Sequence, residues 1–382
     1  MAAEFKEGNP REPAPVPLED AEALGIHRVM DENGELNGDL PDPELPREAV
    51  QHIYQSMSLL RAIEARGWKL QRSGRIAFWI PMQGQEGYQC GAVHAMRDED
   101  WVFRGHREMA AWIMRGASLE KLFAQFFGAA SEPLRGRRLP CLIGDRSINL
   151  VSPATPVGSF LPHAMGAAWA MKLKGTSTRV LCFFGDGGTS RGEFHSAMNF
   201  AGIHRPPAIF ICANNCWAVT TPLDCQTASA NFAAKGDAYA VRNLRIDGND
   251  PLAAYAVTRE AHEKAGEVGT TLIEAITYRL GFHTSSDNPD LYRKKAEDEA
   301  WAKWDPIRRT RLYMQHRDWW SDDDESEMQA RFEKDIQAAV EAAEAMAIPG
   351  PEDQFEALYA EPDWILEDQR ARLVADVEGG AR

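Results

Sequence analysis

Two apolar runs in the sequence end in polar residues whose types suit metal and phosphate binding. The first run closes with Gly-Asp-Gly-Gly at 185–188, and the next closes with Asn-Asn at 214–215. Glycines allow a ligand to approach the backbone closely, and a helix that begins just after them attracts anions. A lone carboxylate, an amide oxygen and a nearby carbonyl form a sparse oxygen set, which magnesium accepts when phosphate and water complete its coordination. The pattern therefore predicts a magnesium-diphosphate site.

Each motif also has a simpler interpretation. Gly-Asp-Gly alone is typical of a tight turn and Asn-Asn of a helix cap, but their occurrence after successive apolar runs favours the site. A magnesium-dependent phosphohydrolase is a second enzymatic hypothesis, and its chemistry needs an aspartyl nucleophile at the end of an earlier strand. The nearest such sequence is Arg-Ile-Asp-Gly-Asn-Asp-Pro at 245–251, which more simply marks a strand that runs into an Asp-Pro helix start.

The segment between the two motifs has the pattern of an amphipathic helix. Phe194, Ala197, Met198 and Ala201 follow the spacing i, i+3, i+4 and i+7. The unit therefore reads as strand, turn, helix and strand, which is a crossover between parallel strands. Ligands of such sheets bind at the carboxyl ends of the strands, where both polar motifs are expected to lie.

The elements that must position these motifs alternate along the chain. Strands are predicted at 178–184, 207–213, 243–247 and 271–280, and helices separate them. Long amphipathic helices are predicted within 46–74 and 322–346. This alternation predicts an α/β fold, with a mostly parallel sheet and helices on both faces.

The chain divides into three predicted regions. Residues 1–46 are rich in proline and acidic residues and read as an extended N-terminal arm rather than a core element. Residues 47–320 are predicted to form the α/β domain that carries both polar motifs and the diphosphate-binding site. Residues 321–382 are predicted to form a C-terminal helical segment. We find no internal repeat.

Bulk composition excludes several classes of partner. The 382 residues carry a net charge of −15, which disfavours binding to nucleic acid or to anionic membranes. No apolar run is long enough to span a bilayer, and the first residues lack the apolar core of a signal peptide. The six cysteines have neither CxxC nor zinc-ligand spacing, so a reducing, cytoplasmic compartment is expected.

The pairing of the two motifs resembles the signature of thiamine diphosphate enzymes. The surrounding stretches narrow the resemblance to the alpha subunit of the decarboxylating first component of 2-oxoacid dehydrogenase complexes. The likeness covers roughly residues 27–370 and implies the thiamine diphosphate-binding fold. Besides the opening motifs, the stretches that carry it are 54–86, 102–108, 161–175, 245–261 and 277–293.

The resemblance assigns the metal and diphosphate contacts. It implies that Asp186, Asn215 and the backbone carbonyl of Trp217 are the magnesium ligands. Gly187 and Gly188 match positions whose backbone contacts the diphosphate. The implied cofactors are therefore thiamine diphosphate and magnesium.

Further positions in the resemblance surround the cofactor. Arg107 matches a diphosphate-binding arginine, as a fixed bidentate cation should, and His106 stands where relatives carry tyrosine. Thr155 and Val157 match positions beside the aminopyrimidine ring, where a branched side chain would help to hold the cofactor bent.

The stretch 277–293 carries the residues that the resemblance places nearest the chemistry. Arg279 matches a cofactor-binding position, and His283 matches both a cofactor contact and the catalytic histidine. A histidine there can bond the substrate carboxylate and move protons near neutral pH. Thr284 replaces a serine that is phosphorylated in some relatives, so regulation of that kind is open.

The resemblance also implies an assembly. Activation of the aminopyrimidine needs a glutamate that this family takes from a separate beta subunit, in a heterotetramer of two alpha and two beta chains. The acyl product would pass to a lipoyl group on an acyltransferase component. We therefore expect the isolated chain to be inactive, and a non-catalytic assembly subunit remains a third hypothesis.

Substrate identity is less constrained by the sequence. Branched-chain 2-oxoacids, such as 3-methyl-2-oxobutanoate, are favoured, and pyruvate is the alternative. Phe78 and Trp79 could line an apolar acyl pocket, although core packing explains them equally well.

Overall fold

The structure is a computed structural model that describes residues 16–380. Its centre is a seven-stranded sheet of order β1-β8-β9-β5-β4-β2-β3, in which all neighbouring strands are parallel. This confirms the predicted α/β class. The sheet strands are β1 Ile26–His27, β2 Trp101–Phe103, β3 Leu150–Val151, β4 Val180–Gly185, β5 Ala208–Asn214, β8 Arg242–Asp247 and β9 Thr271–Ile276. A separate antiparallel hairpin consists of β6 Trp217–Ala218 and β7 Thr221–Pro222.

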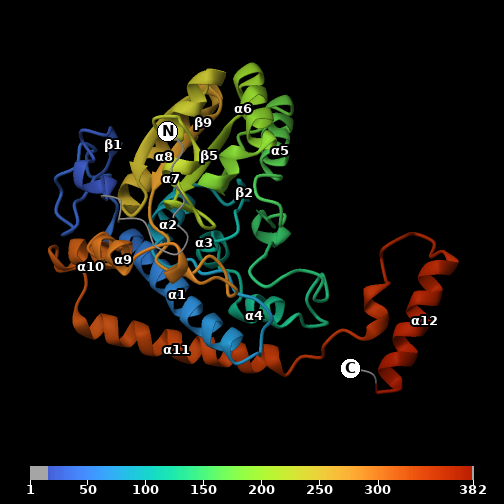
Figure 1. Cartoon of the computed structure of the whole chain (residues 1–382). Coiled ribbons are helices and arrows are strands. Elements are labelled where there is room, and N and C mark those ends of the chain that lie inside the picture. Colours follow the sequence, from blue (N-terminus) through green and yellow to red (C-terminus); the bar gives the residue numbers. More distant parts are fainter. Residues whose placement is uncertain (1–15, 381–382) are drawn as a thin grey trace.

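Helices cover both faces of the sheet, as Figure 1 shows. The α-helices are α1 Arg47–Arg72, α2 Glu86–His94, α3 Ala110–Met114, α4 Leu119–Phe127, α5 Leu161–Leu173, α6 Gly192–His204, α7 Leu223–Gln226, α8 Pro251–Val268, α9 Lys295–Ala302, α10 Pro306–Gln315, α11 Asp322–Glu344 and α12 Trp364–Glu378. Short 3-10 helices are η1 Pro17–Asp20, η2 Arg146–Ile148, η3 Asp186–Ser190, η4 Ala233–Tyr239, η5 Pro289–Leu291 and η6 Pro351–Gln354.

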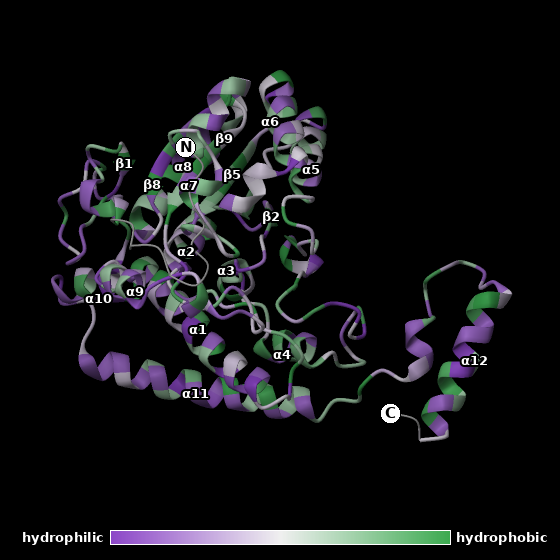
Figure 2. Ribbon diagram, in the orientation of Figure 1, coloured by the Kyte–Doolittle hydropathy of each residue, from purple (hydrophilic) through white to green (hydrophobic). Residues whose placement is uncertain are grey.

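The two central strands are buried on both faces. In β4, Leu181 and Phe183 join the core that contains α1, α2 and α8 residues, whereas Cys182 and Phe184 join the core with α5 and α6 residues. This alternation follows from the two-residue period of a strand. Figure 2 shows the same result as hydrophobic residues concentrated in the sheet and the helices beside it.

The predicted crossover is present between β4 and β5. Phe194, Ala197, Met198 and Ala201 are the buried residues of α6, as their spacing predicted. Gly185 at the end of β4 pairs with Ala213 near the end of β5, so the residues that follow both strands meet at one edge of the sheet. This edge carries both polar motifs.

The prediction of an extended arm over residues 1–46 is wrong for its second half. Ile26 and His27 form the edge strand β1 and pair with β8, and Val29 and Met30 are buried in the core. The backbone N–H groups of Val29 and Met30 donate to a carboxylate oxygen of Asp250, at 2.7 and 2.9 Å. Composition misled because two residues suffice for an edge strand when a neighbouring strand supplies the pairing. Residues 1–15 of the predicted arm lie outside the described residues.

The strand predicted at 271–280 is shorter in the structure. β9 ends at Ile276, and the backbone then leaves the ladder, with the N–H of Leu280 donating to the carbonyl of Gln83 at 3.3 Å. The apolar pattern continues through Leu280 because the segment stays buried or half-buried after the pairing ends.

Helices α11 and α12 lie in the C-terminal region predicted over residues 321–382, of which 381–382 lie outside the described residues. Helix α11 begins at a capping box of Ser321 and Asp324 and buries one face, including Phe332 and Ile336. Helix α12 has no buried residue, and Figure 1 shows it projecting away from the body. Among residues 16–380, no helix has the length and apolar character needed to cross a bilayer.

Candidate active site

A cavity of about 390 Å³ opens at the carboxyl edge of the sheet, a size typical of ligand pockets. Nine of the residues that the resemblance singled out line it together. These residues are His106, Arg107, Thr155, Val157, Asp186, Gly187, Asn215, Trp217 and His283. Gly188 and Arg279 are not among the lining residues. Arg279 contacts two lining residues, Trp217 and His283.

Asp186 begins η3, directly after β4, and only 2% of its surface is exposed. One carboxylate oxygen accepts from the N–H of Gly187 at 2.9 Å, and the other accepts from Nε2 of Gln226 at 3.0 Å. Burial raises the pKa of the Asp186 carboxyl, and these hydrogen bonds lower it in part. In the described part of the chain, no basic side chain forms an ion pair with Asp186. A buried carboxylate without a counter-ion favours the arrival of a cation.

The two asparagines after β5 point in different directions. Asn214 donates to the buried Glu274 carboxylate at 2.7 Å and serves the packing of the sheet. Asn215 lines the cavity, and its side-chain oxygen accepts from the N–H of Trp217 at 3.3 Å. Asp186, Asn215 and Trp217 therefore all line the cavity, and their role as an oxygen set for a metal stays a prediction from the sequence.

The loop after β5 that carries Asn215 and Trp217 has a tightly bent backbone. Cys216 and Val219 have φ values of 71° and 58°, in the left-handed region that favours glycine. Arg279 fixes this loop, since its guanidinium donates to the carbonyls of Trp217 at 3.3 Å and Val219 at 2.8 Å. The backbone strain is thus maintained by a buried side chain from the segment after β9.

His283 lies between two arginines at the cavity wall. Its Nδ1 is 3.0 Å from a guanidinium nitrogen of Arg107 and 3.3 Å from one of Arg279. Guanidinium groups only donate, so Nδ1 is the acceptor and the imidazole proton is on Nε2. Burial, followed by the charges of Arg107 and Arg279, lowers the pKa of His283 to about 3. His283 is therefore neutral near pH 7.

The two arginines leave positive charge beside the cavity. Burial, and then the like charge of Arg279, lowers the pKa of Arg107 to about 10. Arg107 also donates to the carbonyls of Pro81 and His283. Burial likewise lowers the pKa of Arg279. Two cations that disfavour each other in one buried site would be stabilised by an anion.

Two further residues organise this wall and were not predicted from the sequence, Asp287 and Tyr292. The Tyr292 hydroxyl donates to Asp287 at 2.6 Å and accepts from Arg279 at 2.7 Å. Asp287 also accepts from the backbone N–H of His283 at 2.6 Å. Both lie within 277–293, one of the stretches that carried the resemblance, but nothing in their spacing indicated that they share a hydrogen-bond network.

The opposite rim of the cavity is open. Val157 is 42% exposed although it lines the cavity, and Thr155 is also exposed. The His106 ring lies 3.1 Å from the Thr155 carbonyl, and burial lowers the pKa of His106. This side could accept part of a ligand or a second chain.

Of the two aromatic residues suggested for an acyl pocket, one lines the cavity and the other lies in the core. Phe78 lines the cavity together with Leu139 and Leu142. Trp79 is fully buried in the core and packs edge-on against Phe126, so the core interpretation holds for it.

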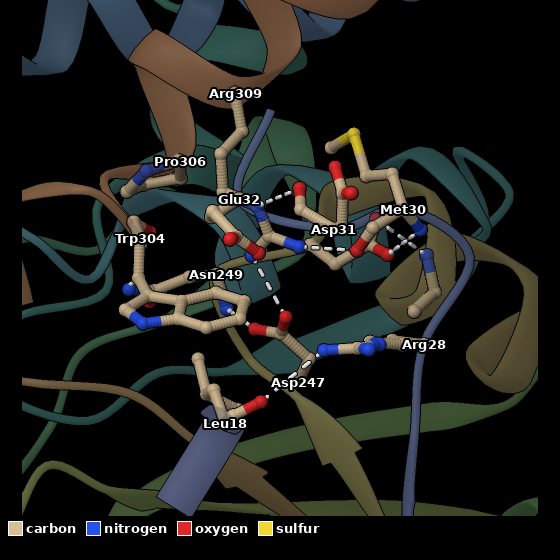
Figure 3. A network of polar contacts seen from close by, with 12 residues as sticks. Leu18, Arg28, Met30, Asp31, Glu32, Asp247, Asn249, Trp304, Pro306 and Arg309 are labelled. Carbon is tan, nitrogen blue, oxygen red and sulfur yellow. Dashed lines mark hydrogen bonds and ion pairs between the residues drawn. The ribbon is translucent and has the colours of Figure 1, made fainter. Parts of the chain in front are cut away.

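The acids at 245–251 do not suit the phosphohydrolase hypothesis. Asp247 is fully buried and forms an ion pair with Arg309 at 2.7 Å, as Figure 3 shows. Asp250 caps α8 by accepting from the N–H groups of Leu252 and Ala253. Neither side chain lines the cavity, so neither is placed as a nucleophile for a ligand bound there.

A search of residues 16–380 finds no group of three His, Cys, Asp or Glu side chains placed to hold a metal. The set at the cavity is of another kind, because it combines one carboxylate with an amide oxygen and a backbone carbonyl. Magnesium accepts such a set when phosphate and water supply the other oxygens.

Comparison with known proteins identifies the class. Residues 54–352 match the family described as Dehydrogenase E1 component, and the chain belongs to this family, as the motifs predicted. It is 37% identical to 2-oxoisovalerate dehydrogenase subunit alpha, mitochondrial, of Bos taurus, with 93% of this chain and 78% of the relative covered. The identity to subunit alpha 2 of Arabidopsis thaliana is 35%, with 92% and 75% covered. The corresponding alpha subunit of Caenorhabditis elegans is 35% identical, with 95% and 84% covered.

Proposed function

We propose that the chain is the alpha subunit of a thiamine diphosphate- and magnesium-dependent branched-chain 2-oxoacid dehydrogenase. The observation that carries the proposal is the charge pattern of one cavity. Among the described residues, Asp186 forms no ion pair on one side of the cavity, and Arg107 and Arg279 form none on the other. A magnesium diphosphate group would satisfy both, with the metal at Asp186 and the phosphates facing Arg107.

The chain's own residues would hold the group and move protons beside it. Asp186, Asn215 and the Trp217 carbonyl would bind magnesium, and the backbone at Gly187 would face the diphosphate. When bound, thiamine diphosphate supplies an electron sink for loss of carbon dioxide from a 2-oxoacid. His283 carries its proton on Nε2, which can donate to a substrate carboxylate or carbonyl oxygen.

The substrate class rests on the cavity wall and on the relatives. Phe78, Ile80, Leu139 and Leu142 form an apolar part of the lining, which suits a branched aliphatic chain. The relatives reported above are named for 2-oxoisovalerate, which favours the branched-chain substrate over pyruvate.

The proposal includes the partners expected from the sequence. A beta subunit in a heterotetramer would cover the open rim at Thr155 and Val157 and contribute the glutamate that activates the cofactor. A lipoyl-bearing acyltransferase would take the acyl product. Five of the six cysteines are free thiols in the described part of the chain, namely Cys90, Cys141, Cys182, Cys212 and Cys216. A reducing, cytoplasmic compartment remains our prediction.

The test is calorimetry on this chain co-expressed with its beta subunit. Thiamine diphosphate should bind only when magnesium is present. Asp186→Asn should abolish this magnesium-dependent binding. Absence of magnesium-dependent binding in the wild-type pair would overturn the proposal. Decarboxylation of 3-methyl-2-oxobutanoate against pyruvate then decides the substrate, and binding without turnover of either would favour a non-catalytic assembly subunit.

A further inference from the structure

Both side-chain ligands of the proposed metal site are held by glutamines from distant segments. Gln85 begins α2 as its N-cap, and Gln226 ends the single turn α7. Gln85 accepts from Nδ2 of Asn215 at 3.0 Å, and Gln226 donates to Asp186 at 3.0 Å. Each of the two proposed ligand side chains is therefore hydrogen-bonded to one glutamine.

The bond to Gln85 decides which way the Asn215 amide points. An asparagine side chain has one oxygen and one NH₂ group, and only the oxygen can bind magnesium. Because Gln85 takes the NH₂ group, the Asn215 oxygen stays on the other side, beside the N–H of Trp217. With the acceptor removed, nothing at this contact would prevent the amide from turning over.

Gln85 is itself fully buried and lines the cavity. The carbonyl of Met82 accepts from its backbone N–H, and Nε2 of Gln89 donates to its carbonyl, so its position is fixed. Its own side-chain Nε2 has no partner among the described residues. An unpaired donor in a cavity costs free energy unless a ligand oxygen completes it.

Gln226 makes the matching arrangement at Asp186. Its Nε2 donates both to the carboxylate and to the Thr221 carbonyl at 3.2 Å, while its buried Oε1 has no partner within residues 16–380. A glutamine orients the carboxylate without neutralising it. An arginine or lysine in the same place would supply the counter-ion and compete with a metal.

We propose that Gln85 and Gln226 are positioning residues that hold the oxygens of Asn215 and Asp186 toward a bound divalent cation. The inference rests on the proposed function, because it requires the metal site. Groups behind metal ligands typically change metal affinity by about 10- to 100-fold when they are removed.

The experiment measures Mn²⁺ in place of Mg²⁺ in the co-expressed pair with thiamine diphosphate, by calorimetry and by the electron paramagnetic resonance signal of free Mn²⁺. We expect Gln85→Met and Gln226→Met to weaken Mn²⁺ binding by about 10- to 100-fold. Gln85→Glu should retain most of the affinity, because its carboxylate still accepts from Asn215. Gln71→Met is the matched control, since Gln71 also has an unpartnered side-chain oxygen but does not line the cavity.

The outcomes separate the two proposals. A wild-type pair that binds no divalent cation contradicts the proposed function itself. A wild-type pair that binds, with Gln85→Met and Gln226→Met binding equally well, contradicts only the positioning role. The same holds if Gln71→Met loses as much affinity, or if Gln85→Glu binds as weakly as Gln85→Met. Melting temperatures show whether each variant is folded, and if one glutamine variant is not, the other decides.

Discussion

Asp186 and Asp247 occupy similar places in the sheet but have opposite surroundings. Each follows or ends a strand at the carboxyl edge, and each is buried. Asp247 has the guanidinium of Arg309 at 2.7 Å, whereas Asp186 accepts hydrogen bonds from the neutral donors Gly187 and Gln226 and forms no ion pair in the described part of the chain. Burial raises the pKa of both carboxyls, and the Arg309 charge lowers that of Asp247.

The difference shows what turns a buried acid into a binding group. Arg309 also donates to the carbonyls of Met30 and Asp31, so the ion pair fixes the N-terminal segment to the sheet (Figure 3). The charge of the Asp247 carboxylate is therefore balanced by a residue of the same chain. Asp186 has no such partner among the described residues, which is why we propose that a cation from outside offsets the cost of its burial.

The largest expected effect is the removal of the internal counter-ion. Arg309→Met should lower the free energy of unfolding by about 3–5 kcal/mol, because it leaves Asp247 buried and unpaired. Arg311→Met is the control, since Arg311 pairs with the exposed Asp322 and should cost at most about 1 kcal/mol. Urea unfolding of both variants measures the difference. A loss below about 1 kcal/mol for Arg309→Met would show that Asp247 does not depend on its partner.

A third buried acid extends the comparison to pH. Glu64 accepts from the N–H of Met82 at 2.6 Å, and burial followed by the charge of Glu86 raises its pKa to about 7. The folded state therefore holds a proton that the unfolded chain releases near pH 4.5. Stability from this group is full below that pH and is lost as the pH rises toward 7.

Glu64→Gln should remove that pH dependence. The amide oxygen can still accept from Met82, and no charge has to be buried. We expect the variant to exceed the wild type by about 2–3 kcal/mol at pH 8 and to match it near pH 4. Unfolding curves at both pH values test this, and an equal difference at both would mean that the carboxyl does not titrate in this range.

Asp186→Asn should behave unlike any change at Asp247. The pKa of Asp186 is higher in the folded state than in the unfolded chain. The free energy of unfolding that this carboxyl contributes is therefore full at low pH and is lost as the pH rises from the unfolded pKa through the folded one. Without metal, the variant should be more stable than the wild type at pH 8, because no buried carboxyl has to ionise. Thermal unfolding of the variant and the wild type, each with and without Mg²⁺, measures this stability difference and any stabilisation by the metal. A variant less stable than the wild type in the absence of metal would place Asp186 with the structural acids.

The sequence allowed Asp186 and Asn215 to be placed at one site because they follow two successive strands. The pairing of β4 with β5 brings both residues to the wall of one cavity, as the crossover pattern implied. Gln85 could not be found in this way, because it lies 130 residues from Asn215 and reaches it only through the packing of α2. The N-terminal strand was missed for a related reason, since the partner that makes Ile26–His27 a strand is β8.

The opposite side of the cavity gives the last comparison, between the site without and with its anion. His283 has a pKa of about 3 because it is buried beside Arg107 and Arg279, so it should stay neutral down to about pH 4 without ligand. A bound diphosphate would offset the arginine charges and raise that pKa. Nitrogen-15 NMR of labelled histidine in the co-expressed pair, titrated with and without thiamine diphosphate and Mg²⁺, reports the protonation directly. A His283 that titrates near 6.5 without ligand would show that the arginines leave no positive charge for an anion to neutralise.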